Sequence, residues 1–201
     1  LAETTKMDYP KHLIQFQVLD DSTDDTHQFT EALCKEYADA GFPVEYIHRT
    51  NRHGFKAGAL NFALRHTAPD AEVVACIDAD YQVTPDWLRD LVPPFANPRM
   101  AIVQGPQDYR DEDENAFKAM CYAEYRGFFH IGMVTRNERN AIIQHGTMVL
   151  LRRSAMQAGG GWATWCIVED AEMGLRLVRD GYKSVYIRDS YGRGLMPDGL
   201  G

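Results

Sequence analysis

The chain has 201 residues, of which 45% are hydrophobic and 11% aromatic, and its 21 basic and 29 acidic side chains give a net charge of −8. A chain of this length buries roughly 70% of its unfolded surface as one compact unit, so we expect a single domain over residues 1–201. The acidic balance argues against a nucleic-acid partner, and no apolar run is long enough to span a bilayer.

The four cysteines are far apart and show no Cys-x-x-Cys spacing; they are Cys34, Cys76, Cys121 and Cys166. Most of them lie within apolar patterns, which favours buried free thiols in a reducing compartment over disulfides or a zinc site. We therefore expect a cytosolic domain.

The first expected strand covers residues 12–19 and leads into the carboxylates of Asp20 and Asp21. Polar side chains at 22–25 are suited to cap the helix that follows, and capping is the simpler explanation for Asp24 and Asp25. That helix is predicted to end at Gly41 and to carry an apolar stripe of Phe29, Leu33 and Tyr37.

A second strand is predicted at 44–48, followed by a loop at 49–58 that leads into a helix. The loop combines two glycines with four basic or potentially basic side chains, namely Arg49, Arg52, His53 and Lys56. Such a loop before a helix N-terminus is typical of a phosphate-binding segment, although the Walker spacing is absent. The alternative is a solvated basic loop with no ligand.

Residues 72–80 form an apolar run, rich in β-branched side chains, that ends in Asp78 and Asp80. The run predicts a buried strand, and we expect Thr84 to cap a helix that has Pro85 at its first position. Open α/β sheets bind ligands at the carboxyl ends of their strands, and side chains two residues apart on an extended segment point the same way. Asp78 and Asp80 are therefore predicted to converge on a hard divalent cation such as Mg²⁺. The alternative is a solvated strand end.

A further strand at 100–103 ends in Gln104 and Gln107, and a long helix is predicted over 115–137. The apolar face of this helix is wide: it includes Phe117, Met120, Cys121, Tyr125, Phe128, Phe129, Gly132 and Met133. Such a face either packs in the core or docks on a membrane-embedded partner.

The last third of the chain alternates strand-like and helical patterns. Residues 141–153 contain strand-like runs around His145, Gly146 and Thr147, and glycines at 159–161 interrupt the chain. A helix is predicted to open at 168–170 and to end at Gly181, with Glu169 and Asp170 in its first turn, where simple capping explains acids equally well. A last strand covers 183–187, and we expect residues 192–201 to lack regular structure.

Five segments, taken in order, resemble one family. They are Val-Leu-Asp-Asp-Ser-Thr-Asp-Asp-Thr at 18–26, Phe-Lys-Ala-Gly-Ala-Leu-Asn at 55–61, Asp-Ala-Asp at 78–80, Val-Gln-Gly-Pro-Gln at 103–107 and Val-Glu-Asp at 168–170. They resemble the inverting family 2 glycosyltransferases, above all the membrane-bound processive β-glucan synthases of the cellulose-synthase-like and β-1,3-glucan-synthase-like group. The resemblance covers nearly the whole chain. It implies the GT-A fold, an α/β fold in which helices flank a mixed central sheet.

The resemblance also implies a donor site for a nucleotide sugar, usually UDP-glucose, with UDP as the leaving group. By this resemblance Asp20 and Asp21 recognise the uracil or ribose, and Lys56 lies near the diphosphate. Asp80, supported by Asp78, holds Mg²⁺ or Mn²⁺ against that diphosphate.

The same resemblance implies an acceptor site for a growing glucan chain. Asp170, with Glu169 beside it, matches the general base of a Thr-Glu-Asp motif in which Val168 replaces the Thr. The acceptor channel is expected to involve Gln104, Gln107, His145 and Gly146. The family usually has Cys where this chain has His145.

The family's first strand and its Gln-x-x-Arg-Trp motif have no match in this sequence. We therefore expect a catalytic core truncated at both ends, cut from a synthase at the cytoplasmic face of a bacterial inner membrane, with a transmembrane channel as its partner. Residues 189–195 resemble the β-1,3-glucan branch of the family more than the cellulose synthases, which implies a β-1,3-glucan product. Two other functions stay open: a haloacid-dehalogenase-like phosphatase, which also uses a strand-terminal Asp-x-Asp, and a non-catalytic nucleotide-sugar-binding module.

Overall fold

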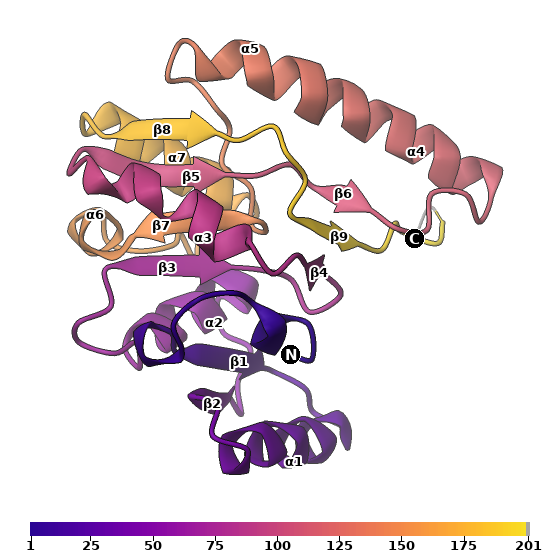
Figure 1. Cartoon of the computed structure of the whole chain (residues 1–201), viewed down its shortest axis with the longest axis vertical. Helices are drawn as coiled ribbons and strands as arrows, with labels where there is room; N and C mark the ends of the chain where they lie inside the picture. Colours follow the sequence, from indigo (N-terminus) through magenta and orange to yellow (C-terminus); the bar gives the residue numbers. More distant parts are fainter. Residues whose placement is uncertain (200–201) are drawn as a thin grey trace.

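The computed structural model describes residues 1–199 and is built around a four-stranded mixed sheet (Figure 1). The strand order is β3 (Val73–Cys76), β7 (Val149–Arg152), β5 (Met100–Gln104) and β8 (Lys183–Tyr186). Strand β7 runs antiparallel to both of its neighbours, whereas β5 and β8 are parallel. The buried strands of this sheet are β5 and β7, whereas β3, predicted to be buried, is an edge strand that is largely half-buried.

Two smaller sheets flank the central one. Strands β1 (Phe16–Asp20) and β2 (Val44–His48) form a parallel pair connected by α1 (Thr26–Asp39). Strand β9 (Gly192–Gly194) lies between β4 (Gln82–Val83), with which it is antiparallel, and β6 (Asp108–Tyr109), with which it is parallel.

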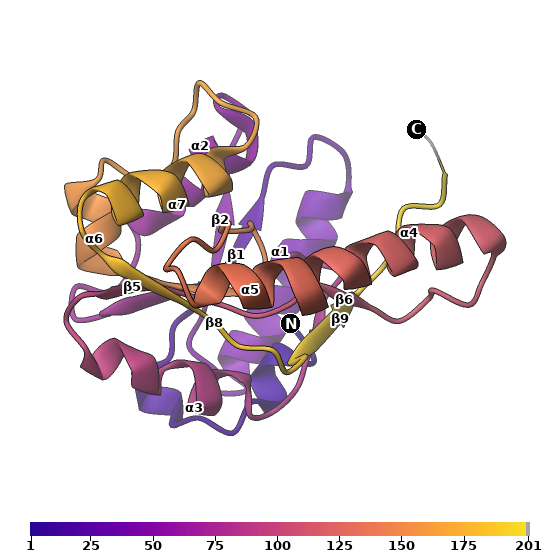
Figure 2. The same cartoon turned by 90° about the horizontal axis from the view of Figure 1, so that it is seen from above.

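Helices cover both faces of the central sheet (Figure 2). On one face lie α2 (Phe55–Leu64), α6 (Arg153–Ala158) and α7 (Glu169–Arg179), and on the other lies α3 (Trp87–Leu91). A long rod crosses beside them; it consists of α4 (Ala116–Gly127), a π-helical turn (Phe128–Gly132) and α5 (Met133–Asn137). Short 3₁₀ turns lie at Thr4–Lys6, Lys11–Leu13 and Pro93–Ala96.

The central sheet separates two apolar clusters, because successive side chains of a strand point to opposite faces. Leu151 and Ile102 pack in one cluster, with Phe129 and Trp162, whereas the neighbouring Leu150 and Val103 pack in the other. The second cluster also contains three large buried side chains near α3: Trp87, Leu91 and Phe95. Both clusters fix the sheet whose strand ends carry the acidic side chains.

Several predicted elements are confirmed, including the strand at 44–48 and the helix stop at Gly41, which has a φ of 85°. The long helix begins after Asn115, whose side chain accepts a hydrogen bond from the Lys118 N–H at 2.9 Å. Its wide apolar face is divided: Phe129 and Met133 are buried, whereas Met120 is exposed. Within residues 1–199 no helix combines the length and apolarity that crossing a bilayer requires.

Other expectations are wrong for identifiable reasons. Residues 11–13 form a 3₁₀ turn, so the first strand begins only at Phe16. Phe29 is 72% exposed, and the buried side chain of α1 is Cys34. Thr84 does not cap α3, since that helix begins at Trp87 and Asp86 is the residue that precedes it.

Two further corrections concern the last third of the chain. Within the predicted strand-like region at 141–153 the strand is β7, which begins at Val149, whereas residues 145–147 are irregular and bend before it. Residues 192–194, expected to lack regular structure, form β9. The backbone of this glycine-containing segment pairs with strands on both sides, which no hydrophobic pattern in the sequence indicates.

Candidate active site

Lys56 and Asp78 form the centre of the candidate site. Gly54, with a φ of 74°, precedes α2, so that helix begins earlier than predicted and carries Lys56 in its first turn. The Lys56 Nζ donates a hydrogen bond to Asp78 Oδ1 at 2.5 Å. Asp78 lies just beyond the end of β3, and its own N–H donates to the hydroxyl of Thr147 at 3.0 Å. The basic loop and the Asp-Ala-Asp segment thus meet, as the resemblance requires.

Gly146 brings Asp170 into the same cluster. A Cβ on Gly146 would lie 3.1 Å from Lys56 Nζ and 3.3 Å from Asp170 Oδ2. Both side chains therefore converge over the bare backbone of this glycine, which a larger residue would crowd. A cationic amine and a carboxylate from distant parts of the sequence therefore lie beside the same glycine.

Asp170 lies in the first turn of α7, and its Oδ1 accepts a hydrogen bond from the Ala171 N–H at 2.7 Å. Glu169 precedes it in the same turn and is half-buried. Oδ2 of Asp170 is the oxygen that faces Gly146 and Lys56.

Asp80 has a different set of partners from Asp78. Its Oδ2 accepts a hydrogen bond from the Leu195 N–H at 2.8 Å, and its carbonyl oxygen accepts one from Arg110 at 2.6 Å. Asp78 is instead paired with Lys56. The two carboxylates, which we expected to share one cation, thus have separate contacts in this structure. Leu195 and Arg110 were missed from the sequence because nothing local indicates a contact over such a separation.

Asp21 is held by Arg49, at the end of β2. The Arg49 Nε donates to Asp21 Oδ1 at 2.8 Å, and its Nη2 binds the other carboxylate oxygen. The same guanidinium donates to the carbonyl oxygens of His53 and Phe55, at 3.2 and 3.1 Å. Arg49 was expected to bind phosphate. In the structure its guanidinium instead binds the Asp21 carboxylate and the backbone of the loop.

Asp20 is also satisfied within the protein. Its carboxylate accepts hydrogen bonds from the backbone N–H and the hydroxyl of Ser22 and from the hydroxyl of Tyr46, at 2.8 Å for the N–H and for Tyr46. Burial alone raises the pKa of Asp20, but these hydrogen bonds outweigh burial and hold the pKa below its ordinary value. Asp20 is thus an anion that organises the turn after β1.

The Arg49–Asp21 pair yields a stability prediction. Replacing Arg49 by Met removes the charge that compensates Asp21, whose side chain is 19% exposed. We expect Arg49→Met to lower the free energy of unfolding by about 3 kcal/mol, as for other buried ion pairs that lose one partner. Urea denaturation measures this value. Lys35→Met is the matched control, since Lys35 pairs with Asp39 on the exposed surface of α1, and exposed pairs contribute little. Equal effects of the two substitutions would contradict the prediction.

The residues expected to line the acceptor channel are not all accessible to an acceptor. Gln104 is fully buried: its amide nitrogen donates to the carbonyl oxygens of Gly105 and Thr147, and its amide oxygen accepts from the His145 N–H. The expectation that Gln104 contacts an acceptor directly is therefore corrected. Its side chain instead supports the segment at 145–147. Gln107 is half-buried and accepts a hydrogen bond from the Tyr109 hydroxyl at 3.2 Å.

His145 packs behind the cluster against Phe128 and Phe129 of the π-helical turn, with ring centroids 5.4 and 5.0 Å away. Burial lowers the pKa of His145, and the charge of Asp170 partly opposes this shift. His145 is therefore neutral at physiological pH, an uncharged neighbour for Asp170. No hydrophobic pattern indicated the π-helical turn that provides this packing.

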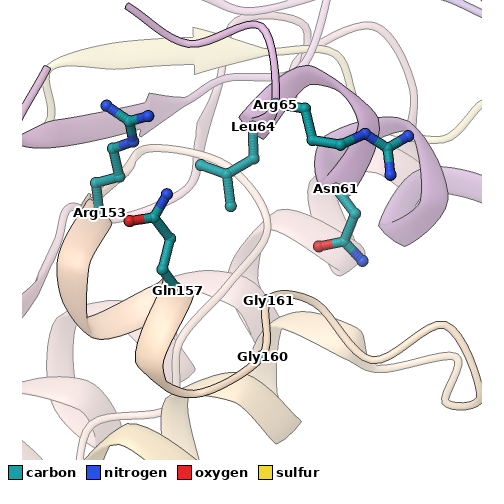
Figure 3. A pocket seen from close by; sticks show the side chains of 7 residues that line it. All are labelled: Asn61, Leu64, Arg65, Arg153, Gln157, Gly160 and Gly161. Carbon is teal, nitrogen blue, oxygen red and sulfur yellow. The ribbon is translucent and has the colours of Figure 1, made fainter. Parts of the chain in front are cut away.

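Two cavities lie beside α2, yet neither is lined by Lys56, Asp78, Asp80 or Asp170. One, of about 500 Å³, lies between α2 and α6, and Figure 3 shows the Arg65 and Arg153 guanidinium groups on either side of Leu64 there. The other, of about 540 Å³, adjoins it near Arg49 and Thr164. Three large apolar side chains close in sequence to Lys56 or Asp170 are exposed: Phe55, Trp165 and Ile167.

Known proteins can be compared with this geometry. The sequence profile of glycosyl transferase family 2 matches residues 14–160. Glucomannan 4-beta-mannosyltransferase 7 of Arabidopsis thaliana is 32% identical over 193 residues, which cover 94% of this chain and 35% of the relative. Glucomannan 4-beta-mannosyltransferase 2 of the same plant is 33% identical over 187 residues, covering 91% and 35%. The chain thus spans about a third of the length of these curated relatives.

Solved structures agree on the fold. The mannosyltransferase PcManGT from Pyrobaculum calidifontis, in complex with GDP-Man and Mn²⁺, superposes with a TM-score of 0.74 at 23% identity, covering 98% of this chain and 52% of that one. S. aureus TarS 1-349, in complex with UDP-GlcNAc, has a TM-score of 0.72 at 15% identity, covering 99% and 54%. These matches confirm the expected GT-A fold. With the profile match over most of its length, the chain belongs to glycosyl transferase family 2.

Proposed function

We propose that this chain catalyses inverting transfer of a hexose from a nucleoside-diphosphate sugar to the end of a β-linked glycan. The observation that carries the proposal is the convergence of Lys56 and Asp170 over Gly146, which places a cation and a basic carboxylate in one exposed site. A transferase of this kind needs both: the carboxylate accepts a proton and the cation faces the departing phosphate. A phosphatase or a pure binding module has no need for Asp170 at this position.

The proposed reaction assigns a role to each group. Asp170 Oδ2 removes the proton of the acceptor hydroxyl while that oxygen attacks the anomeric carbon and the bond to the diphosphate breaks, so the diphosphate departs with the electron pair. Lys56 stabilises the negative charge that grows on this leaving group. Asp20 and Asp21 support the nucleoside end of the donor through the turn that they order. The half-buried Glu169 is the second candidate for the base.

A divalent cation, Mn²⁺ or Mg²⁺, fits this proposal at Asp80. Within residues 1–199 no hydrogen bond or ion pair reaches Asp80 Oδ1, whereas the Asp78 carboxylate is paired with Lys56. The described residues contain no cluster of three or more His, Cys, Asp or Glu side chains arranged for a metal. Cations of this class accept one or two carboxylates and complete their shell with phosphate and water. Bound there, the cation would offset charge on the diphosphate.

For the donor we propose GDP-mannose before UDP-glucose. The relatives that match nearly the whole chain are named glucomannan mannosyltransferases, and PcManGT was solved with GDP-Man. The resemblance of the sequence motifs to glucan synthases is the support for UDP-glucose and a β-1,3 product. The same resemblance supports a parent protein at the cytoplasmic face of an inner membrane with a transmembrane channel.

A donor panel tests the proposal. The full-length protein is incubated with GDP-mannose, GDP-glucose or UDP-glucose, an oligosaccharide acceptor and Mn²⁺, and the product linkage is determined. We expect transfer from GDP-mannose to exceed transfer from UDP-glucose. Transfer from UDP-glucose alone would overturn the donor assignment but keep the reaction. Release of phosphate from phosphomonoesters without transfer, or nucleotide binding without turnover, would overturn the proposed function itself.

A further inference from the structure

The Asp80 carboxylate is held by a segment 115 residues further along the chain. The Leu195 N–H donates to Asp80 Oδ2 at 2.8 Å. This contact belongs to the 192–196 segment, which contains β9 and the two residues after it. A backbone N–H that binds one oxygen of a carboxylate orients the whole group, because the second oxygen then has a defined position.

Gly194 allows this close approach. A Cβ on Gly194 would lie 2.9 Å from Asp80 Oδ2 and 2.4 Å from the ring of Tyr81. Real Cβ atoms do not approach so closely, so any other residue would push the segment or the carboxylate away. Tyr81 is buried and leaves little room for such a shift. The requirement for glycine here is thus set by the backbone of Gly194 lying against the Asp-Ala-Asp segment.

Further contacts anchor the 192–196 segment on both sides. Arg110 Nη1 donates to the carbonyl oxygens of Asp80 and Arg193, at 2.6 and 2.7 Å, and so ties the two segments together. The Met196 N–H donates to Asp111 Oδ1 at 2.9 Å, and Asp111 is paired with the buried Lys118 at 2.6 Å. These anchors keep the Leu195 N–H in place.

We propose that the 192–196 segment is a positioning element for the donor cation: Leu195 holds Asp80 Oδ2 and leaves Oδ1 to bind the metal. The proposal rests on the proposed function, since it assigns the metal of that function to Asp80. Gly194, Leu195 and Arg110 act through Asp80 and are positioning residues. The geometry also links the donor site to the chain that follows β9, so a displacement of that chain would change the affinity for the metal.

The test compares Gly194→Ala with Gly199→Ala in the full-length protein. A Cβ on Gly199 would meet nothing within 4 Å, so this variant is a matched control a few residues away. Free Mn²⁺ is measured by electron paramagnetic resonance during titration in the presence of GDP. We expect Gly194→Ala to weaken Mn²⁺ binding roughly 10- to 100-fold, the usual effect of losing a group that orients a metal ligand. Gly199→Ala should bind as the wild type does.

Arg110→Ala is the second variant, because the exposed Arg110 side chain can be removed without opening the core. We expect it to weaken Mn²⁺ binding in the same direction while the thermal midpoint without metal stays near that of the wild type. If Gly194→Ala does not fold, the Mn²⁺ affinity of Arg110→Ala decides between the two outcomes. Wild-type Mn²⁺ affinity in Arg110→Ala, or in a folded Gly194→Ala, would overturn the positioning role. Wild-type protein that binds no Mn²⁺ with either GDP or UDP would instead overturn the metal in the proposed function.

Discussion

Asp170→Asn is expected to lower the rate of glycosyl transfer by roughly 10²- to 10⁴-fold, the usual contribution of a positioned general base. The Asn side chain keeps an oxygen that can accept the Ala171 N–H, so the first turn of α7 should be unchanged. The group that replaces Oδ2 cannot accept a proton from the acceptor. Steady-state rates with the full-length protein measure the loss. Nucleotide affinity, measured by calorimetry, should change little, because the proposed reaction places Asp170 on the acceptor side.

Glu169→Gln provides the matched control for this variant. Glu169 shares the first turn of α7 and carries the same charge, yet it is Asp170 Oδ2 that faces Gly146 and Lys56. We expect Glu169→Gln to keep most of the transfer activity. If Asp170→Asn retains near wild-type rates and Glu169→Gln is inactive, the base is Glu169 and the assignment made here is wrong.

Asp80→Asn is expected to remove the effect of Mn²⁺ on nucleotide binding. The substitution keeps the shape of the side chain, and its amide oxygen can still accept the Leu195 N–H. The oxygen left for the cation is replaced by an NH₂ group, which cannot bind a metal ion. We expect the Mn²⁺ affinity in the presence of GDP to fall by at least about 100-fold, beyond the range for a merely supporting group.

Asp78→Asn distinguishes a direct ligand from a supporting one. Asp78 already neutralises Lys56, so its loss should weaken Mn²⁺ binding less than the loss of Asp80 does. Titration calorimetry with GDP, with and without Mn²⁺, compares both variants. A larger effect of Asp78→Asn would show that the cation displaces Lys56 and binds Asp78 first.

The sequence was sufficient to predict secondary structure where the local residue pattern and the tertiary environment favour the same conformation. The runs at 44–48 and 73–76 became strands, and the glycine at 181 follows the end of α7 with a φ of 89°, because local backbone preference and the surrounding structure favour the same conformation there. Asp78 and Asp80 were found from their position after the strand at 73–76 alone. The proximity of Asp78 to Lys56 was then expected from the resemblance to the family.

The partners of those acids could not be predicted, since they come from distant segments. The hydrogen bond from the Leu195 N–H to Asp80 joins residues 115 positions apart. The Asp21 carboxylate is bound by Arg49, which was expected to belong to a phosphate-binding loop. Gln104 was expected to contact a ligand because it is polar and lies in the family segment at 103–107. Its side chain is buried in the structure, which rules out that contact. Packing against neighbouring elements, and not local propensity, decided each of these cases.

The separate pairing of β1 with β2 has a consequence for motion. Within the described part of the chain, the ladder of β1 runs to β2 and not to the central sheet, and its link to α2 includes a side-chain hydrogen bond from Gln17 to the Ala63 carbonyl at 3.3 Å. Strand β7, by contrast, is hydrogen-bonded on both sides. The β1–β2 pair can therefore open as a small cooperative unit while the central sheet stays folded, so its amides exchange with solvent at a lower free energy. In the proposed donor site, Asp20 and Asp21 would thus belong to a region of lower local stability than Asp78 and Asp80, which follow β3 of the central sheet.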